Sequence, residues 1–459
     1  MKTDLNNNPK SKIEKPKSYH RLELQNLLQE SPYQAYVYSY PHKTAYRPIE
    51  PPISLSNLWA KQDKNALFLY IHIPFCEMRC GFCNLFTTVT HNEDFVSQYI
   101  NAVKRQAQQV KAALGESSFA RFAIGGGTPT QLPIGGLEAI LDIASETMGA
   151  NLSCIPGSVE MSPETVDKDK LNLLRSRGID RASIGVQSFI DAEVLAIHRR
   201  QKSQQVKDAI ALMRNAGFPT INIDLMYGLP GQSVDTFLYS IRQALQFQPE
   251  EIYLYPLYVR PLTGMGISNR EWDDIRLACY REGRDFLLAE GYTQVSMRMF
   301  RAKQATAFEG PVYCCQADGM VGLGCGARSY TDSLHYSNDY AVDAKEVRDI
   351  LQDFINRSDE SFAYANYGFQ LDESERQRRY ILLSLLSDEG LSFAAYRQQF
   401  GTDAIADFPE LPQLLSLKLA NLDNETLRLT EFGVERSDTI GAWLFSDKVQ
   451  QLMQTYEVK

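Results

Sequence analysis

The chain has 459 residues, a hydrophobic fraction of 44% and a formal net charge of −9. This length exceeds one typical core, so we expect two or three domains, one of which could be a barrel of more than about 200 residues. The acidic balance argues against a nucleic acid partner, no apolar run is long enough to span a membrane, and eight cysteines do not suggest a disulfide framework. A cytoplasmic location is therefore expected.

The first 65 residues are expected to form two different segments. Residues 1–20 are polar and rich in Asn and Lys, so we expect a disordered tail. Residues 21–65 are expected to form a strap over the mouth of the domain that follows. This strap includes the aromatic run YVYSYP at 36–41, followed by His42, Tyr46 and Arg47.

The most informative segment follows an apolar run at 66–73. It places Cys76, Cys80 and Cys83 within eight residues. Three thiolates leave one iron of a four-iron cluster without a protein ligand, and such an iron is open to chemistry. Gly81 gives the loop backbone freedom. A zinc site with a remote fourth ligand, or three unrelated thiols, is the alternative.

From residue 66 onward, apolar runs of strand length alternate with helical patterns, which is typical of βα units around a parallel sheet. Strands are expected at 66–73, 120–124, 158–161, 181–186, 220–226 and 251–257. Helices are expected at 92–114 and 203–215, where apolar residues recur on one face. The six units predict an α/β fold, an incomplete (β/α)6 barrel of the TIM type over residues 66–300.

Four further motifs end or follow these strands. They lie at 125–130, 160–163, 187–189 and 224–230. Loops after parallel strands gather at the carboxyl end of a barrel, where ligands bind. The alternatives are structural, because the glycines could form only a tight turn, and Glu160, Arg199 and Asp224 could form ion pairs. His72 is expected to be packed or bonded to backbone rather than to be a metal ligand.

The last third of the chain has a different pattern. Residues 301–373 are expected to form a connecting segment, in which Cys314, Cys315 and Cys325 could hold a second cluster, although buried free cysteines are the more common case. Residues 374–459 predict a small winged-helix-like α+β domain. Residues 376–459 carry nine Lys and Arg against twelve Asp and Glu, so we expect a cap or docking domain rather than a nucleic acid binder.

Taken together and in this order, the motifs resemble the radical S-adenosylmethionine superfamily and, within it, the oxygen-independent coproporphyrinogen III oxidase group that includes HemN and HemW. The resemblance runs from about residue 36 to the C-terminus and rests on YIHIPFCEMRCGFC at 70–83, GGGTP at 125–129, GVQSF at 185–189 and IDLMYGLP at 223–230. It implies that Cys76, Cys80 and Cys83 ligate a [4Fe-4S] cluster whose open iron holds S-adenosylmethionine. Cleavage by one electron would give a 5′-deoxyadenosyl radical that abstracts a substrate hydrogen.

The resemblance also implies which residues contact S-adenosylmethionine. They are Tyr70, Phe82, Gly126, Gly127, Thr128, Glu160, Gln187, Arg199, Asp224 and Tyr258. The glycines would let the backbone approach the methionine amino group, and Glu160 would accept hydrogen bonds from a ribose hydroxyl or an ammonium. An electron donor such as flavodoxin or ferredoxin is implied as a partner.

Two positions depart from the group. Leu85 stands where the oxidase branch has a further cysteine, and GPVYCCQAD at 310–318 lacks the His and Trp that are linked to haem binding in the HemW branch. In contrast, the strap segment 36–47 resembles the oxidase branch, and its aromatic and basic residues would suit a flat tetrapyrrole bearing propionates. An ordered strap without this role is the alternative.

The first hypothesis is therefore a radical S-adenosylmethionine oxidoreductase, similar to coproporphyrinogen III oxidase, that acts on a tetrapyrrole-like small molecule by oxidative decarboxylation in porphyrin biosynthesis. A haem-binding or haem-delivery protein of the HemW type is the second hypothesis. A radical methyltransferase or a haem-degrading enzyme is the third.

Overall fold

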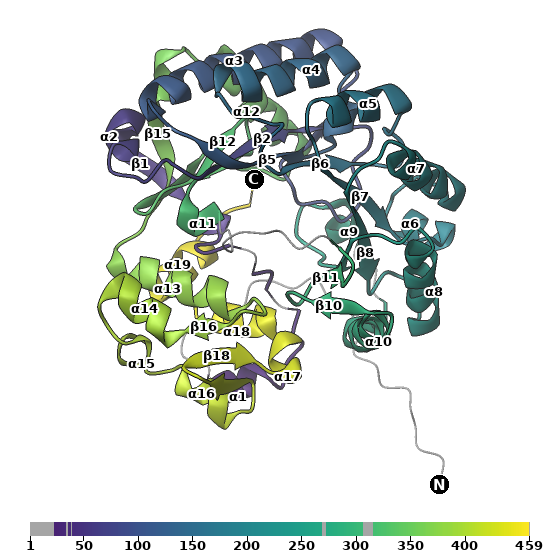
Figure 1. The fold of residues 1–459 in the computed structure, drawn as a ribbon, viewed down its shortest axis with the longest axis vertical. Helices are drawn as coiled ribbons and strands as arrows, with labels where there is room; N and C mark the ends of the chain where they lie inside the picture. The colour runs from purple at the N-terminus through teal and green to yellow at the C-terminus, as the bar shows by residue number, and fades with distance from the viewer. Residues whose placement is uncertain (1–22, 34, 38, 269–271, 306–314, 459) are drawn as a thin grey trace.

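The computed structural model describes residues 23–458, apart from residues 34, 38, 269–271 and 306–314 (Figure 1). The expected tail at 1–20, Cys314 and the side chain of Cys315 lie outside the described part. The described chain forms one large mixed sheet with helices around it and a smaller domain at the C-terminus.

The centre of the large sheet consists of six neighbouring parallel strands in chain order. They are β2 (Leu67–Ile73), β5 (Phe119–Gly126), β6 (Gly157–Met161), β7 (Arg181–Gln187), β8 (Thr220–Tyr227) and β9 (Glu251–Pro256). Each begins and ends within two residues of its expected bounds, so the α/β prediction with six βα units is confirmed.

Helices cover the outside of this parallel region, as Figure 1 shows. They include α3 (Glu93–Leu114), α4 (Ile134–Asp142), α5 (Lys168–Ser176), α7 (Ser203–Asn215) and α8 (Val234–Leu245). α3 begins after Asn92, whose side chain accepts a hydrogen bond from the backbone N–H of Phe95 at 3.0 Å. Tyr99 and Val103 of α3 are buried, as the helical pattern predicts. None of the described helices is long and apolar enough to cross a bilayer.

The sheet extends beyond the six central strands at both edges. On one side follow β12 (Met320–Leu323), β13 (Arg328–Tyr330), β14 (Leu334–Ser337), β15 (Tyr364–Gln370) and β1 (Arg47–Ser54), and on the other β11 (Met299–Ala302) and β10 (Tyr292–Gln294). β12 pairs in parallel with β2, whereas the outer strands pair antiparallel. Residues 301–373 therefore do more than connect two domains, because four of their strands complete the sheet.

The C-terminal domain is a small α+β unit, as expected. It contains α13 (Glu373–Leu385) and a three-stranded sheet in the order β16 (Leu391–Ser392), β18 (Thr426–Leu429), β17 (Ala420–Asp423).

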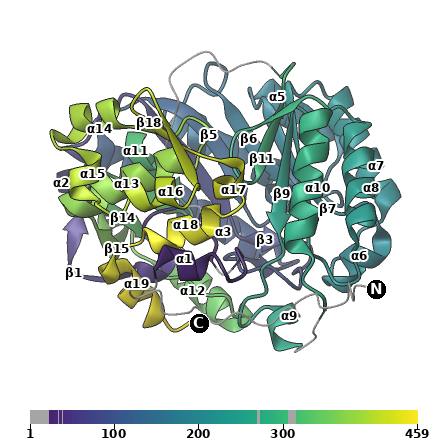
Figure 2. The same cartoon turned by 90° about the horizontal axis from the view of Figure 1, so that it is seen from below.

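The N-terminal segment packs on this domain rather than on the barrel alone. α1 (Leu24–Leu27) lies beside α18 (Ser437–Trp443) in Figure 2, and Val37 and Tyr40 share a hydrophobic cluster with the C-terminal domain. The strap thus joins the two parts of the molecule.

Candidate active site at the cysteine loop

The three cysteines lie directly after β2, at the carboxyl end of the parallel strands. Cys76 ends β3 (Phe75–Cys76), which pairs in parallel with β4 (Thr88–Val89) and so closes the loop that carries Cys80 and Cys83. All three thiols are half-buried and none forms a disulfide. The structure thus gathers three free thiols on one short closed loop, the donor type that iron-sulfur clusters require.

Neighbouring loops hold the middle of the cysteine loop at Gly81. Its N–H donates to the carbonyl of Ile197 at 2.9 Å, and its carbonyl accepts from the N–H of Met265 at 2.8 Å. A Cβ at this position would lie 2.7 Å from Nδ1 of His198. Only glycine therefore allows the loop to pass this close to the segment before α7 and to α9 (Gly264–Ile267).

Arg199 connects the cysteine loop to the end of β7. Its guanidinium donates to the carbonyl of Gly185 at 2.6 Å and to Oε1 of Gln201 at 2.6 Å, and Nη1 lies 3.7 Å from Sγ of Cys80. Gln187 follows a β-bulge and adopts a left-handed backbone with φ 68°. A Cβ on Gly185 would lie 3.0 Å from Nε2 of Gln187 and 3.7 Å from Nη2 of Arg199, so the structure brings these two predicted residues together at the end of β7.

The glycine loop after β5 packs against the cysteine loop. The N–H groups of Gly127 and Thr128 donate to the carbonyls of Ile73 and Phe75, both at 2.7 Å. A Cβ on Gly127 would lie 2.6 Å from the carbonyl oxygen of Phe75 and 2.9 Å from Sγ of Cys76. The glycine at this position therefore sets how closely the two loops approach each other.

Burial raises the pKa of the Cys76 thiol, and it also raises that of Cys80, where the charge of Arg199 partly offsets the effect. Thiols in such surroundings ligate iron as thiolates only when the metal displaces the proton. Within the described residues, no three His, Cys, Asp or Glu side chains are arranged for a single metal ion.

Glu160 and Asp224 supply two carboxylates to the same end of the barrel. Glu160 accepts the N–H of Gly126 at 3.0 Å, and Asp224 accepts from Nδ2 of Asn222 at 2.7 Å. Glu160 has accessible surface, but protein atoms surround it, and burial raises its pKa to about 7, with a further contribution from Asp224. Burial likewise raises the pKa of Asp224 to about 6. Both groups thus titrate close to neutral pH, as ligand-binding carboxylates often do.

His72 is a packed histidine, as predicted. Its Nε2 lies 3.0 Å from the carbonyl oxygen of Phe86, and its Nδ1 lies 3.2 Å from the hydroxyl of Tyr70. Cβ atoms on Gly126 and Gly326 would both lie within 2.8 Å of the ring. Burial lowers the pKa of His72 to about 4, so the ring is neutral at pH 7.

Phe82 and Tyr258 lie at the side of the site formed by β8 and β9. Phe82 packs against a small apolar cluster that includes Met226 and Leu257. The Tyr258 hydroxyl donates to Asp438 of the C-terminal domain, which also forms an ion pair with Arg298 at 2.5 Å. The predicted contacts of these residues with S-adenosylmethionine stay predictions.

Some residues of the site were missed at the sequence level. Asn222 lies two positions before Asp224 on the same strand and therefore on the same face, which is the signal that could have revealed it. Ser183 of the neighbouring strand holds Asn222 in turn, since Nδ2 of Asn222 donates to Oγ of Ser183 at 2.7 Å. No sequence pattern could have revealed the ion pair of Arg298 with Asp438, because 140 positions separate the two residues.

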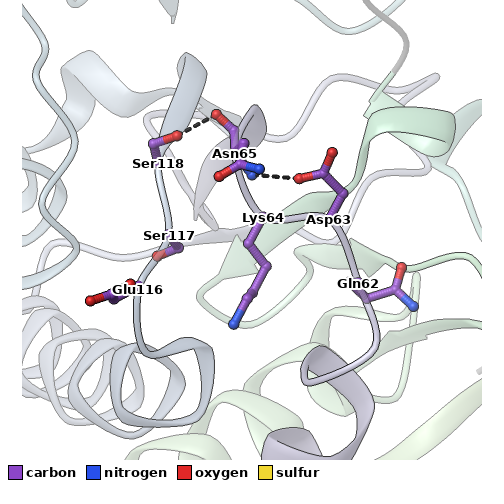
Figure 3. A pocket seen from close by; sticks show the side chains of 7 residues that line it. All are labelled: Gln62, Asp63, Lys64, Asn65, Glu116, Ser117 and Ser118. Carbon is purple, nitrogen blue, oxygen red and sulfur yellow. Dashed lines mark hydrogen bonds between the residues drawn. The ribbon is translucent and has the colours of Figure 1, made fainter.

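A surface hollow of about 410 Å³ lies at the other end of the strands (Figure 3). It is lined by residues 62–65 before β2 and 116–118 before β5. The Nζ of Lys64 donates to the carbonyl of Leu114 at 2.7 Å, and the N–H of Asn65 donates to Asp63 at 3.0 Å. These contacts shape two surface loops, and none of the predicted site residues lies there.

Two protein-family models match the chain. A model of the radical SAM superfamily matches residues 70–244, and a model of the HemN C-terminal domain matches residues 371–435. The heme chaperone HemW of Bacillus subtilis is 27% identical over 383 residues, which cover 82% of this chain and 98% of that protein. HemW of Escherichia coli is 30% identical over 276 residues, 57% of this chain and 69% of that protein.

Relatives with an oxidase name are equally similar. The oxygen-independent coproporphyrinogen III oxidase of Salmonella typhimurium is 26% identical over 377 residues, 78% of this chain and 79% of that protein. Among solved structures, coproporphyrinogen III oxidase (HemN) from Escherichia coli superposes with a TM-score of 0.75 at 23% identity and covers 92% of this chain and 98% of that chain. This superposition supports the fold.

Proposed function

The chain belongs to the radical S-adenosylmethionine superfamily, in its HemN and HemW group, and from this premise we propose that it is an oxidoreductase acting on a tetrapyrrole-like small molecule. The reaction class we propose is oxidative decarboxylation of the kind named for the coproporphyrinogen III oxidases. The observation that carries this proposal is the set of three free, half-buried thiols on a closed loop beside the glycine loop.

The residues of this loop fit a [4Fe-4S] cluster. Cys76, Cys80 and Cys83 are the proposed ligands, and Gly127 leaves room beside Sγ of Cys76 that a Cβ would fill. When bound, such a cluster supplies the electron that cleaves S-adenosylmethionine to a carbon radical. Arg199 beside Cys80 places a fixed positive charge next to the ligands, which favours the thiolate form of Cys80.

The chain's own polar groups would position S-adenosylmethionine. We propose that Glu160 and Asp224 accept hydrogen bonds from its hydroxyl or ammonium groups, and that Gln187 and Arg199 form the opposite wall. Asn222 orients the Asp224 carboxylate from the same strand, so Asp224 does not need to reorganise when a ligand binds. Tyr70, Phe82 and Tyr258 would enclose the nucleoside and exclude water.

Haem delivery is the second candidate function. It is favoured by the match to HemW of Bacillus subtilis, which covers nearly all of that protein, and by Leu85, which stands where the oxidase branch has a cysteine. In this case the protein would bind haem, and the cluster would serve a regulatory purpose.

Anaerobic reconstitution tests the core of the proposal. The reduced protein should show the electron paramagnetic resonance signal of a [4Fe-4S] cluster, S-adenosylmethionine should change that signal, and 5′-deoxyadenosine should accumulate. A Cys80→Ala variant should lose all three properties, whereas Cys154→Ala, which removes an exposed cysteine far from the loop, should keep them. A Cys80→Ala variant that retains the signal and the cleavage would contradict the proposal.

Substrate assays separate the two candidate functions. Decarboxylation predicts that coproporphyrinogen III loses carbon dioxide in step with 5′-deoxyadenosine formation. Deoxyadenosine without a porphyrin product would reject the oxidase reaction. Haem delivery instead predicts a Soret shift on titration of haem at micromolar protein, and its absence would reject that function.

A further inference from the structure

The cysteine loop carries one carboxylate, that of Glu77, directly after Cys76. The loop also contains one cationic side chain, Arg79, but this residue is engaged elsewhere. Its guanidinium donates to the carbonyl of Val342, and it forms no ion pair with Glu77. The negative charge that the loop brings next to its own thiols is therefore not neutralised by the cation of the same loop.

Ser162 holds the Glu77 carboxylate in place. Its hydroxyl donates to Oε1 of Glu77 at 2.6 Å. Ser162 directly follows β6 and is itself fixed by a turn, because its carbonyl accepts the N–H and the hydroxyl of Thr165 at 3.0 and 3.1 Å. Ser162 is also buried, with 6% of its surface exposed. The carboxylate is thus attached to the end of β6 at a defined position beside the loop.

The second oxygen of this carboxylate has no partner. Oε2 of Glu77 is buried and accepts no hydrogen bond from the described residues. No Lys or Arg in the described part of the chain forms an ion pair with Glu77. Burying a carboxylate without satisfying both oxygens costs free energy of folding. A buried group that stays unsatisfied in this way needs an explanation other than stability.

The charge of Glu77 acts on two of the three thiols. Burial is the largest cause of the raised pKa of Cys76 and of Cys80, and the negative charge of Glu77 adds to it at both sulfurs. At Cys80, the charge of Arg199 acts in the opposite direction. A negative charge that disfavours a thiolate also disfavours any further negative charge placed at the same sulfurs.

We propose that Glu77, held by Ser162, lowers the reduction potential of the iron-sulfur cluster that the three cysteines bind. The inference rests on the proposed function for the presence of this cluster. Reduction adds one electron, and therefore one negative charge, while the ligands stay the same, so a fixed carboxylate beside the sulfurs disfavours it. A lower potential makes the reduced cluster a stronger one-electron donor, which cleavage of S-adenosylmethionine requires. Glu77 thus acts through the cluster and not on the substrate.

A redox titration of the full-length reconstituted protein, without S-adenosylmethionine, tests this role. Dithionite is the reductant, and the electron paramagnetic resonance signal reports the reduced cluster. Glu77→Gln removes the charge but keeps an oxygen that can accept from Ser162. At a fixed potential, the ratio of reduced to oxidised cluster should rise about tenfold, which corresponds to about 59 mV for a one-electron couple. Glu77→Ala should shift the potential in the same direction, and it replaces Glu77→Gln if that variant binds less iron than wild type.

Control variants separate charge from shape. Glu77→Asp keeps the charge and should stay close to the wild-type potential. Glu164→Gln removes an exposed carboxylate two positions after Ser162, so it changes the net charge equally and should leave the potential unchanged. A wild-type potential in Glu77→Gln and Glu77→Ala would overturn the inference, and so would a shift in Glu77→Asp as large as that in Glu77→Gln. The expected shifts in a protein that forms no 5′-deoxyadenosine would reject the proposed function but support this role of Glu77, whereas a wild-type protein that binds no cluster would overturn both.

Discussion

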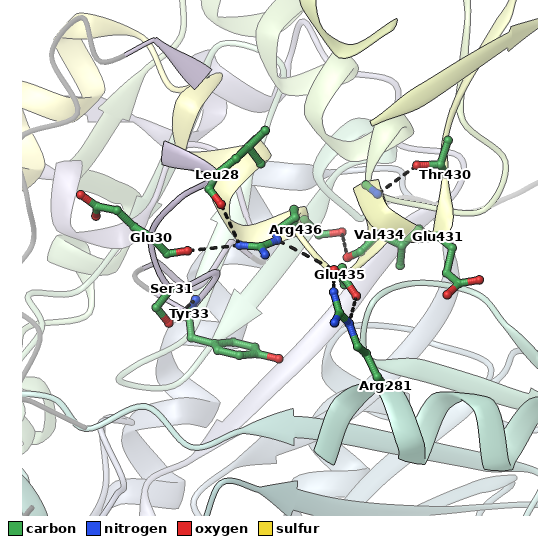
Figure 4. Close-up of polar contacts among 12 residues, drawn as sticks. Leu28, Glu30, Ser31, Tyr33, Arg281, Thr430, Glu431, Val434, Glu435 and Arg436 are labelled. Carbon is green, nitrogen blue, oxygen red and sulfur yellow. Dashed lines mark hydrogen bonds and ion pairs between the residues drawn. The ribbon is translucent and has the colours of Figure 1, made fainter. Parts of the chain in front are cut away.

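The barrel mouth and the junction between the barrel and the C-terminal domain both contain cationic side chains. Among the described residues, Lys43 and Arg260 at the mouth form no ion pair with a carboxylate, whereas the arginines at the junction do. At the junction, Arg281 and Arg284 of α10 (Arg276–Ala289) and Arg436 surround Glu435. Arg281 binds this carboxylate through two hydrogen bonds of 2.6 and 2.8 Å, and Figure 4 shows Arg436 between Glu435 and the carbonyls of Leu28 and Glu30.

The comparison separates two uses of buried charge. At the junction each guanidinium has a carboxylate partner within the protein, so the charges hold the domains and the N-terminal segment together. At the mouth, Lys43 and Arg260 have no such partner within the part of the chain that the structure describes, and the carboxylates Glu160 and Asp224 have a raised pKa. Lys43 and Arg260 therefore do not join two elements through an ion pair with a described carboxylate, as the junction arginines do.

The largest expected effect comes from breaking the junction. Glu435→Gln leaves three arginines around a neutral, buried side chain, and Glu435 is only 2% exposed. Removing one partner of a buried ion pair costs about 3 kcal/mol, so the midpoint of urea unfolding should fall clearly.

A matched control for this variant is Glu425→Gln. Glu425 pairs with Arg397 at 2.7 Å, but both side chains are 40% or more exposed, and such pairs contribute about 0.5 kcal/mol or less. If the two variants shifted the midpoint equally, the junction would not be a structural charge network.

The next effect concerns the packing of the mouth. Gly127→Ala would place a Cβ 2.9 Å from Sγ of Cys76, so the glycine and cysteine loops must separate. We expect a loss of about 2 kcal/mol in stability and less bound iron per protein after reconstitution. The control is Gly135→Ala in α4, where a Cβ meets no atom within 4 Å and should stabilise the helix by about 0.5–1 kcal/mol. Full iron content in Gly127→Ala would show that the close approach is not required.

The sequence predicted the central part of the fold well, because the patterns that encode each strand and helix there are local in sequence. Each of the six βα units carries its own alternation of apolar strand and amphipathic helix, so the helix at 203–215 was predicted to the residue. The edge strands could not be predicted in this way. β12 has four residues and pairs with β2, about 250 positions away, and no local pattern encodes such a pairing.

The same distinction applies to the site. The cysteines, the glycine loop and Glu160 were found because each motif is contiguous in sequence and follows a strand. Contacts made by single residues from distant elements were not found, such as the ion pair of Arg298 with Asp438 or the position of Lys43 over Tyr340. They depend on how the strap and the C-terminal domain pack, which is decided by tertiary structure.

Substitution of Glu160 should change stability less than Glu435→Gln or Gly127→Ala, and it should stabilise the protein rather than destabilise it. Its raised pKa means that the folded protein prefers the protonated carboxyl, so ionisation destabilises the fold as pH rises from 4.5 through about 7. Glu160→Gln, which cannot ionise, should match wild type in stability at pH 4.5 and exceed it at pH 8, by about 1 kcal/mol after allowance for solvent access. Unfolding midpoints at the two pH values measure this, and a variant that is less stable at pH 8 would contradict the raised pKa of Glu160.

The smallest expected effect compares two lysines directly. Lys170 donates to the carbonyl of Thr130 at 2.7 Å and pairs with Asp167 at 3.3 Å, so Lys170→Met should cost about 1 kcal/mol. Burial and the charges of Arg328 and Arg260 lower the pKa of Lys43, which means that its positive charge destabilises the folded protein at neutral pH. Lys43→Met should therefore leave the unfolding midpoint unchanged or raise it slightly at pH 7, without ligand. If Lys43→Met instead lost as much stability as Lys170→Met, Lys43 would be a structural residue, and the mouth would not differ from the junction.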